Sequence, residues 1–316
     1  MTRWQRAILL VLIVLFISAP YSNDGLAKLG PRGKRYKFGG AYIGSDPSMS
    51  LDGSKIVFGS TRYGLGDICS VNSDGTNWVR LTETPEYEGE SSFSPDGDKI
   101  VFVSERDGNG EIYVMNSDGA NQTRLTHCVY YDANPSFSPD GSKIVFSRNI
   151  PHPSTGVLFS HLFIMNCDGT EVRKITYRDA WYYGPRFSPD GKKIIFKAVW
   201  QGKEGSTGIG MINVDGSNEV RIKKCSCFYP SFSSNGKKVI FVVDWHDQGE
   251  EELWTMSLDS EALRRIPLSK NVDIVSPVYV QGGKRILFLN SLNEKGGQIC
   301  IMNEDGTNFK TICNTY

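Results

Sequence analysis

The sequence between residues 44 and 316 repeats one pattern six times, and this repetition limits the possible folds more than any other feature. Each copy holds a four-residue turn, Ser-Pro-Asp-Gly or a variant of it, and two residues later an apolar triplet. The turns lie at residues 50–53, 94–97, 138–141, 188–191, 233–236 and 280–283, and the triplets at 56–58, 100–102, 144–146, 194–196, 239–241 and 286–288. A period of 44 to 50 residues indicates an array of small structural units.

The apolar triplets predict strands that are covered on both faces. Ile100, Val101 and Phe102 are typical, because they lack the alternation of a half-exposed strand. A third predicted strand over 112–116 and a short fourth strand over 124–126 follow in the second copy. Four antiparallel strands per repeat, arranged around a ring, form β-propeller blades. We therefore predict an all-β fold, a six-bladed β-propeller with four antiparallel strands per blade and almost no helix.

The Ser-Pro-Asp-Gly segments are predicted to be hairpin turns and not ligand sites. Proline presets φ at the second position, and glycine supplies the residue with positive φ. An EF-hand calcium loop needs acidic residues at alternate positions and a terminal Glu, which these segments lack. A second set of turns, Asp-Gly in five copies, separates the third and fourth strands, and Ser260 is its exception.

Composition excludes two broad classes of function. The chain has 35 basic and 35 acidic side chains, and 22% of its residues are charged. This balance argues against an intrinsically disordered chain and against a nucleic-acid binder driven by bulk charge. The four histidines show no metal-ligand spacing, so we expect neither a metal site nor a cofactor.

The N-terminal residues form a separate module. Two arginines precede an apolar segment over residues 7–19, which is short for spanning ~30 Å of hydrocarbon but matches the core of a secretory signal peptide. We predict that residues 1–27 are a signal peptide cleaved before Lys28 or, alternatively, an uncleaved membrane anchor. A basic linker over 28–43 then leads into the propeller. The protein is accordingly expected in the periplasm or the secreted space, with membrane tethering as the alternative.

Seven cysteines leave at least one thiol unpaired in an oxidising compartment. Cys225 and Cys227 flank a single residue, whereas Cys69 and Cys300 occupy equivalent third-strand positions in blades that adjoin on ring closure. Packed sheets lie ~10 Å apart, while the Cα atoms of a disulfide need about 4.4 to 6.8 Å, so no bridge is expected between Cys69 and Cys300. Most cysteines are predicted to be small buried apolar residues.

The order of motifs within one unit resembles the TolB-type propeller repeat. Phe-Ser-Pro-Asp-Gly and the Ile-Val-Phe triplet are followed by Glu111–Asn116, Asp118-Gly119 and Arg124–Thr126. The resemblance covers roughly residues 44–316 and is weaker in the last two units. It implies a propeller of the cell envelope. TolB, a periplasmic component of the Tol-Pal system, carries an α/β domain before its propeller, which we expect to be missing here.

The predicted topology places the variable segments on one face of the propeller. Loops between second and third strands emerge there, as do the connectors between blades, and long loops are expected over 147–161, 197–208 and 243–252. Function tends to lie on variable loops held by a rigid scaffold, and exposed aromatic rings bind sugars or apolar side chains. The candidate ligand-binding residues are Tyr87, Tyr130, Tyr131, Trp181, Tyr182, Tyr183, Trp200, Phe228, Tyr229, Trp245 and His246.

These observations predict a non-catalytic binding or scaffold module. Its partner is expected to be an envelope or secreted protein, or a glycan, and not a nucleic acid; contact with the membrane is expected only through an uncleaved N-terminal segment. No catalytic residue is assigned. The alternative is a carbohydrate-active enzyme that resembles propeller-type oligosaccharide lyases and uses a His-containing metal site on the loop face.

Overall fold

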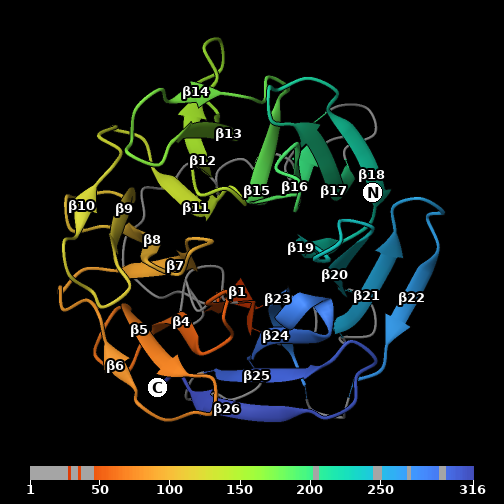
Figure 1. Ribbon diagram of the computed structural model, residues 1–316. Coiled ribbons are helices and arrows are strands. Elements are labelled where there is room, and N and C mark those ends of the chain that lie inside the picture. The colour runs from red at the N-terminus through yellow and green to blue at the C-terminus, as the bar shows by residue number, and fades with distance from the viewer. Residues whose placement is uncertain are drawn as a thin grey trace.

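The computed structural model describes residues 28–29, 35–36, 46–201, 206–244, 251–268, 272–291 and 297–316. Within these ranges, six four-stranded antiparallel sheets are arranged in a ring (Figure 1). Each sheet is a blade made of four consecutive strands. The described part of the chain contains a single helical element, the 3-10 turn η1 (Gln281–Gly283). The predicted six-bladed β-propeller is confirmed.

The blades follow one another in sequence order, and the first strand of each lies nearest the axis (Figure 1). A short pair, β1 (Lys28–Leu29) and β2 (Arg35–Tyr36), precedes them. The first three blades consist of β3 (Ser48–Met49), β4 (Lys55–Ser60), β5 (Asp67–Asn72), β6 (Val79–Arg80); β7 (Glu88–Phe93), β8 (Lys99–Ser104), β9 (Glu111–Asn116), β10 (Thr123–Arg124); and β11 (Asp132–Phe137), β12 (Lys143–Pro151), β13 (Leu158–Asn166), β14 (Arg173–Lys174). The last three consist of β15 (Ala180–Phe187), β16 (Lys193–Trp200), β17 (Ser206–Asn213), β18 (Val220–Lys224); β19 (Cys227–Phe232), β20 (Lys238–Asp244), β21 (Glu251–Ser257), β22 (Leu263–Ile266); and β23 (Ile274–Val280), β24 (Arg285–Asn290), β25 (Gln298–Asn303), β26 (Lys310–Asn314).

This topology gives the ring two different faces. Turns between the first and second strands, and between the third and fourth, lie on what we call the turn face. Loops between the second and third strands, and the connectors between blades, lie on the loop face. The prediction of a long loop over 147–161 is wrong for most of that segment. Its residues extend strands β12 and β13 instead, which stay paired out to Pro151 and Leu158. β16 and β17 likewise pair out to Trp200 and Ser206.

The core lies between neighbouring blades, as the continuous apolar triplets predict. The phenylalanine that ends each triplet is fully or almost fully buried at Phe58, Phe102, Phe146, Phe196, Phe241 and Phe288. These side chains belong to apolar clusters that each draw on adjacent blades. Burying one such ring contributes about 1.5–3 kcal/mol, and the repeated triplets contribute side chains to every cluster between neighbouring sheets.

In the described ranges the ring closes by packing, since the first and last blades have no strand in common there. Ile56 and Phe58 of the first blade lie in one cluster with Leu287 and Ile299 of the last. Two hydrogen bonds reinforce this contact, from Ser60 Oγ to the carbonyl of Thr315 (2.6 Å) and from Arg62 Nη2 to the carbonyl of Tyr316 (2.8 Å).

The hairpin assignment of the repeated turns is confirmed. Gly141 has φ +71°, and the hydroxyl of Ser138 hydrogen-bonds Asp140 within the same turn. Asp140 also accepts a hydrogen bond from the backbone N–H of Ser142 at 3.0 Å, and these bonds lower its pKa. Serine and aspartate therefore stabilise the turn from within, which explains their recurrence without a ligand.

The cysteines divide into one disulfide and five free thiols. Cys225 and Cys227 are bonded, with their Cα atoms 5.1 Å apart. Cys69 and Cys300 are buried and unbonded, as predicted, whereas Cys167 is exposed. The predicted signal peptide or anchor lies outside the described residues, as does most of the linker. Among the residues described, the structure contains no helix with the length and apolar character needed to span a bilayer.

Candidate functional site

Three of the candidate aromatic residues are buried, and the expectation that their side chains face solvent is wrong. Tyr87, Tyr182 and Trp200 are at most 6% exposed. Tyr182 lies on the innermost strand β15 and not on a connector, so its side chain points into the core between blades. Its hydroxyl donates to Glu219 Oε1 at 3.0 Å, and the same oxygen accepts from Trp200 Nε1 at 3.1 Å.

Four candidates remain accessible at the inner strands of the fourth and fifth blades. Tyr183 and Tyr229 are exposed, whereas Trp181 and Phe228 are half-buried. Trp181 Nε1 donates to the carbonyl of Leu158 at 2.9 Å. Trp181 thus packs against the third blade, whereas the rings of Phe228 and Tyr229 lie side by side, with centroids 6.2 Å apart. Lys197 Nζ lies 3.5 Å from the Phe228 ring centroid and 5.7 Å from that of Tyr183.

The connector between the second and third blades carries two more candidates. Tyr130 and Tyr131 are half-buried, and the hydroxyl of Tyr131 donates to Glu105 Oε1 at 2.9 Å. Trp245 and His246 lie outside the described residues. The predicted aromatic set is thus not one continuous surface, because some members pack inward.

The loop face also exposes four large side chains that the sequence analysis missed. Val129 and Tyr177 lie on connectors and are 86% and 72% exposed. Tyr63 and Leu65, in the loop between β4 and β5, are also exposed. The sequence analysis missed them because no periodic pattern marks an exposed residue on a connector or loop.

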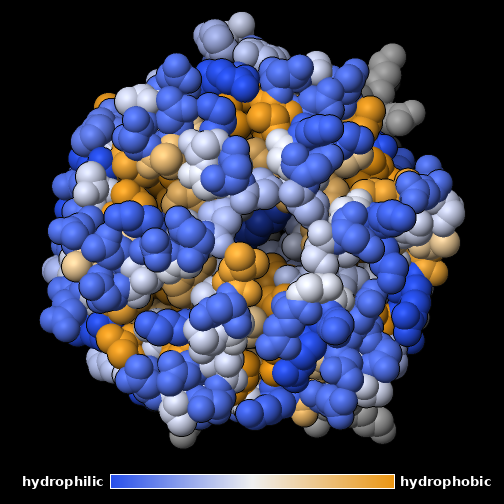
Figure 2. Space-filling view, in the orientation of Figure 1, coloured by the Kyte–Doolittle hydropathy of each residue, from blue (hydrophilic) through white to orange (hydrophobic). Residues whose placement is uncertain are grey.

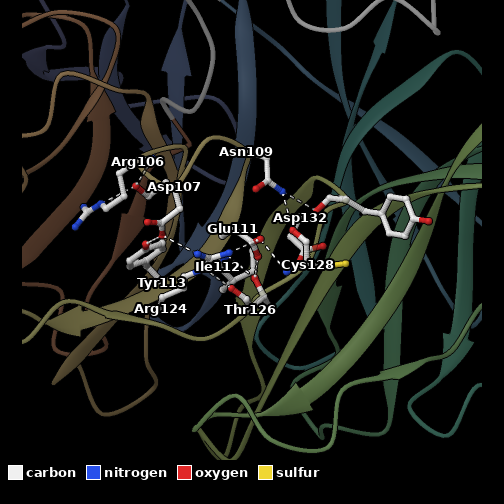
Figure 3. A network of polar contacts seen from close by, with 12 residues as sticks. Arg106, Asp107, Asn109, Glu111, Ile112, Tyr113, Arg124, Thr126, Cys128 and Asp132 are labelled. Carbon is white, nitrogen blue, oxygen red and sulfur yellow. Dashed lines mark hydrogen bonds and ion pairs between the residues drawn. The ribbon is translucent and has the colours of Figure 1, made fainter.

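A buried polar network fixes the connector that presents Val129 (Figure 3). Glu111 is fully buried and accepts hydrogen bonds from Arg124 Nη2 (2.8 Å), Thr126 Oγ1 (2.5 Å) and the backbone N–H of Cys128 (2.9 Å). Asn109 Nδ2 donates to the carbonyls of Cys128 and Tyr130, both at 3.0 Å. The side chains of blade two therefore hold the connector backbone on both sides of Val129.

Around the axis, one residue from each blade, on its innermost strand or, for Asp46, just before it, contributes to a polar ring. Five of its members have φ between +50° and +55° and lie at a β-bulge of the innermost strand. Bulges re-aim side chains, here at the point where the blades converge. The ring consists of Asp46, Glu90, Asn134, Gly184, Tyr229 and Ser276. Sequence analysis missed this ring. A signal was present, because five of its six members directly precede a proline and lie four residues before a repeated Ser-Pro-Asp-Gly-type turn.

Side-chain hydrogen bonds link ring members of successive blades. Glu90 Oε2 accepts from the backbone N–H of Asn134 at 2.5 Å, and Asn134 Oδ1 accepts from that of Gly184 at 3.2 Å. The hydroxyl of Ser276 bonds Asp46 across the closure of the ring. Burial raises the pKa of Glu90 to about 7, and the nearby charges of Asp46 and Glu105 add to this shift, against the Asn134 hydrogen bond and Arg186.

On the turn face, the axis opens into a hollow of about 290 Å³. Figure 2 shows the hollow at the centre of the ring, with strongly hydrophilic residues at its floor. Its lining includes Arg186 together with apolar side chains of the inner strands, among them Phe137 and Phe187. The serine hydroxyls and the guanidinium of Arg186 in this lining can bind polar groups.

The histidines do not form a metal centre in the described part of the chain. His161 is buried, which lowers its pKa to about 4, and its Nδ1 lies 3.5 Å from Thr176 Oγ1. His152 Nε2 lies 3.7 Å from Asp179. The described ranges hold no group of three or more His, Cys, Asp or Glu side chains suited to a metal ion.

Six consecutive four-stranded blades with short turns on one face and longer connections on the other define a six-bladed β-propeller. A family model described as the TolB beta propeller domain matches residues 32–158, 84–224 and 161–315. The chain belongs to the TolB β-propeller domain family. The search of curated proteins finds no match.

Solved structures share this fold at low sequence identity. TolB from Acinetobacter baumannii is 20% identical with a TM-score of 0.67, over 81% of this chain and 63% of its own. An oligogalacturonate lyase in complex with manganese is 15% identical with a TM-score of 0.61, over 87% and 77%. A chain of a nidogen/laminin complex is 13% identical with a TM-score of 0.59, over 78% and 88%. These likenesses show the fold alone, and this chain spans less than two thirds of the Acinetobacter TolB.

Proposed function

We propose that the chain is a non-catalytic binding module of the cell envelope or secreted space, and that its loop face binds a partner protein or a glycan. The observation that carries this proposal is the exposure of large apolar side chains on that face, most of all Val129 and Tyr177. Loops held by a rigid scaffold often carry binding residues, and large apolar side chains on them serve as anchors for a partner. The Glu111 network adds support, because it holds the Val129 connector in place before any partner arrives.

The test compares binding by the full chain and by the double variant Val129→Ser/Tyr177→Ser. A glycan panel and peptidoglycan-associated envelope proteins serve as probes. We expect affinity to fall about tenfold or more, since exposed apolar anchors dominate such interfaces. The melting temperature should stay nearly unchanged, because neither side chain belongs to a core cluster.

The matched control is Leu51→Ser, which removes an equally exposed apolar residue from the turn face. It should leave binding intact. Equal binding by the wild type and the loop-face double variant, with both folded, would contradict the proposal. Activity on oligogalacturonate with manganese would instead favour the carbohydrate-active alternative.

A further inference from the structure

The outer turn of the fifth blade departs from the pattern of the other five. In those blades the glycine N–H of the Asp-Gly turn donates to the carbonyl of an asparagine three residues earlier, as Gly216 does to Asn213 at 2.9 Å. In the fifth blade Ser260 replaces the glycine, and its N–H reaches the side chain of Ser257 at 3.4 Å. The closing hydrogen bond also spans one residue more, from the N–H of Ser257 to the carbonyl of Ala262, although Thr255 and Arg264 pair at the same separation as Val114 and Thr123.

The glycine matters because its backbone touches the preceding blade. A Cβ atom added at any of the five glycines would lie only 2.3 to 3.0 Å from a carbonyl oxygen of that blade or of the segment that follows it. Gly216, for example, would place its Cβ 3.0 Å from the carbonyl of Ile175. Serine carries a Cβ and cannot take this position. The turn of the fifth blade therefore does not close against the fourth blade as its counterparts do.

The result is a groove of about 670 Å³ between the fourth and fifth blades, on the turn face. Its lining is mixed, and we call the apolar part of it the floor, which includes Met211, Ile222, Phe232 and Leu258. Ile222 is only half-buried, whereas Ile175, its equivalent at the preceding interface, is fully buried. A groove of this volume with an apolar floor lies within the range of ligand-binding sites.

Charges at the rim indicate what could fill the groove. Asp259 and Glu261 lie on the exposed outer turn, and neither forms an ion pair with another described residue. On the facing blade the guanidinium of Arg221 is held 4.3 Å from the Trp200 ring centroid. The lining also contains Asp190 and Lys193, so its acidic side chains outnumber its basic ones by three to two. The two carboxylates of the outer turn, beside the apolar floor, complement a positive charge that is carried next to an apolar side chain.

We propose that this groove binds an extended peptide segment of a partner protein, in which an aliphatic side chain stands next to a basic residue. The aliphatic side chain covers the floor formed by Ile222 and Leu258, and the basic residue pairs with Asp259 and Glu261 at the outer end. This site is separate from the proposed loop-face site, because it lies on the opposite face of the ring.

The test uses the full chain and a phage-displayed library of random peptides, followed by affinity measurements with synthetic copies of the selected peptides. We expect the selected peptides to share an aliphatic residue next to Lys or Arg. Leu258→Ser and Glu261→Lys should each weaken their binding about tenfold. Serine suits the turn at position 258, since Ser73 and Ser117 stand at the equivalent places.

The matched control is Glu171→Lys, since Glu171 is an exposed turn residue of the third blade with the same φ of 55° as Glu261. It should leave peptide affinity unchanged. A second variant, Ser260→Gly, restores the glycine of the other outer turns in a hairpin of unchanged length, and it should abolish binding without loss of thermal stability. Failure to select peptides, selection of peptides without the basic and aliphatic pair, or equal weakening by Glu171→Lys would each overturn the proposal.

Discussion

Tyr182 and Tyr183 are adjacent residues on β15 with opposite surroundings. Tyr182 is fully buried and its ring packs edge-on against Phe196, with centroids 5.2 Å apart, whereas Tyr183 is exposed. We expect Tyr182→Ala to lower the free energy of unfolding by about 3–5 kcal/mol, as aromatic truncations in a core do. Tyr183→Ala should cost less than about 1 kcal/mol. Urea denaturation measures both, and equal losses would contradict the burial pattern.

Glu90 makes the free energy of unfolding depend on pH in the direction opposite to that of a carboxyl group whose pKa is lowered by folding. Its pKa of about 7 lies above the ordinary value of 4.5, so the folded state binds its proton more tightly than the unfolded chain does. Its contribution is therefore most favourable below pH 4.5 and is lost as the pH rises to about 7. The loss amounts to about 1.4 kcal/mol per unit of pKa difference.

Replacement of Glu90 by glutamine removes this titration. We expect the unfolding free energy of Glu90→Gln to change less between pH 5 and 8 than that of the wild type, and to exceed it at pH 8. Chemical denaturation across that range measures the difference, with Glu171→Gln as an exposed control. Parallel pH profiles for the wild type and Glu90→Gln would show that the axial carboxyl titrates normally.

At the scale of elements, the sequence predicts strands better than it predicts the boundaries between strands and connectors. The triplet at 144–146 is identifiable alone, because a continuous apolar run needs cover on both faces. The assignment of Trp181 and Tyr182 to a strand depends instead on pairing with Val199 and Ala198 of β16. That pairing is a tertiary contact, so inspection of residues 180–183 alone could not place these rings.

The outer turns show a similar limit for the candidate sites. Ser260 is visible in the sequence as an exception to the Asp-Gly pattern. The reason that it opens a groove is a contact between blades. In the other turns the glycine lies against a backbone carbonyl of the preceding blade or of the segment that follows it, and a residue with a Cβ atom does not fit there. The axial ring likewise depends on bulges that bring Glu90 and Asn134 within hydrogen-bond distance across two blades. Repeats fix the form of a blade, while contacts between blades decide where polar groups meet.

At the scale of the whole molecule, every blade is built in the same way, from four consecutive strands, and the ring closes by packing between the first and last blades. Among the strands that the structure describes, none is shared between the first and last blades, and the ends of the ring meet through contacts such as Ser60 with Thr315. Any connector between blades could therefore serve as the opening of the ring. The connector before β7 suits this purpose, because Pro85 is exposed and the break would leave every ladder intact.

A circular permutant tests this equivalence. The permuted chain would run from residue 86 to 316, continue through a Gly/Ser linker and end with residues 46–85. We expect it to form the same ring, with an unfolding free energy within about 2 kcal/mol of that of a linear 46–316 chain, since closing a linker of moderate length costs little and exposed connectors tolerate new ends. Circular dichroism and urea denaturation measure the outcome. A second permutant opened between Val101 and Phe102 should fail to fold, because it divides a central strand whose side chains are fully buried. If the connector permutant also fails, closure depends on the native order of the blades and not on packing between the first and the last.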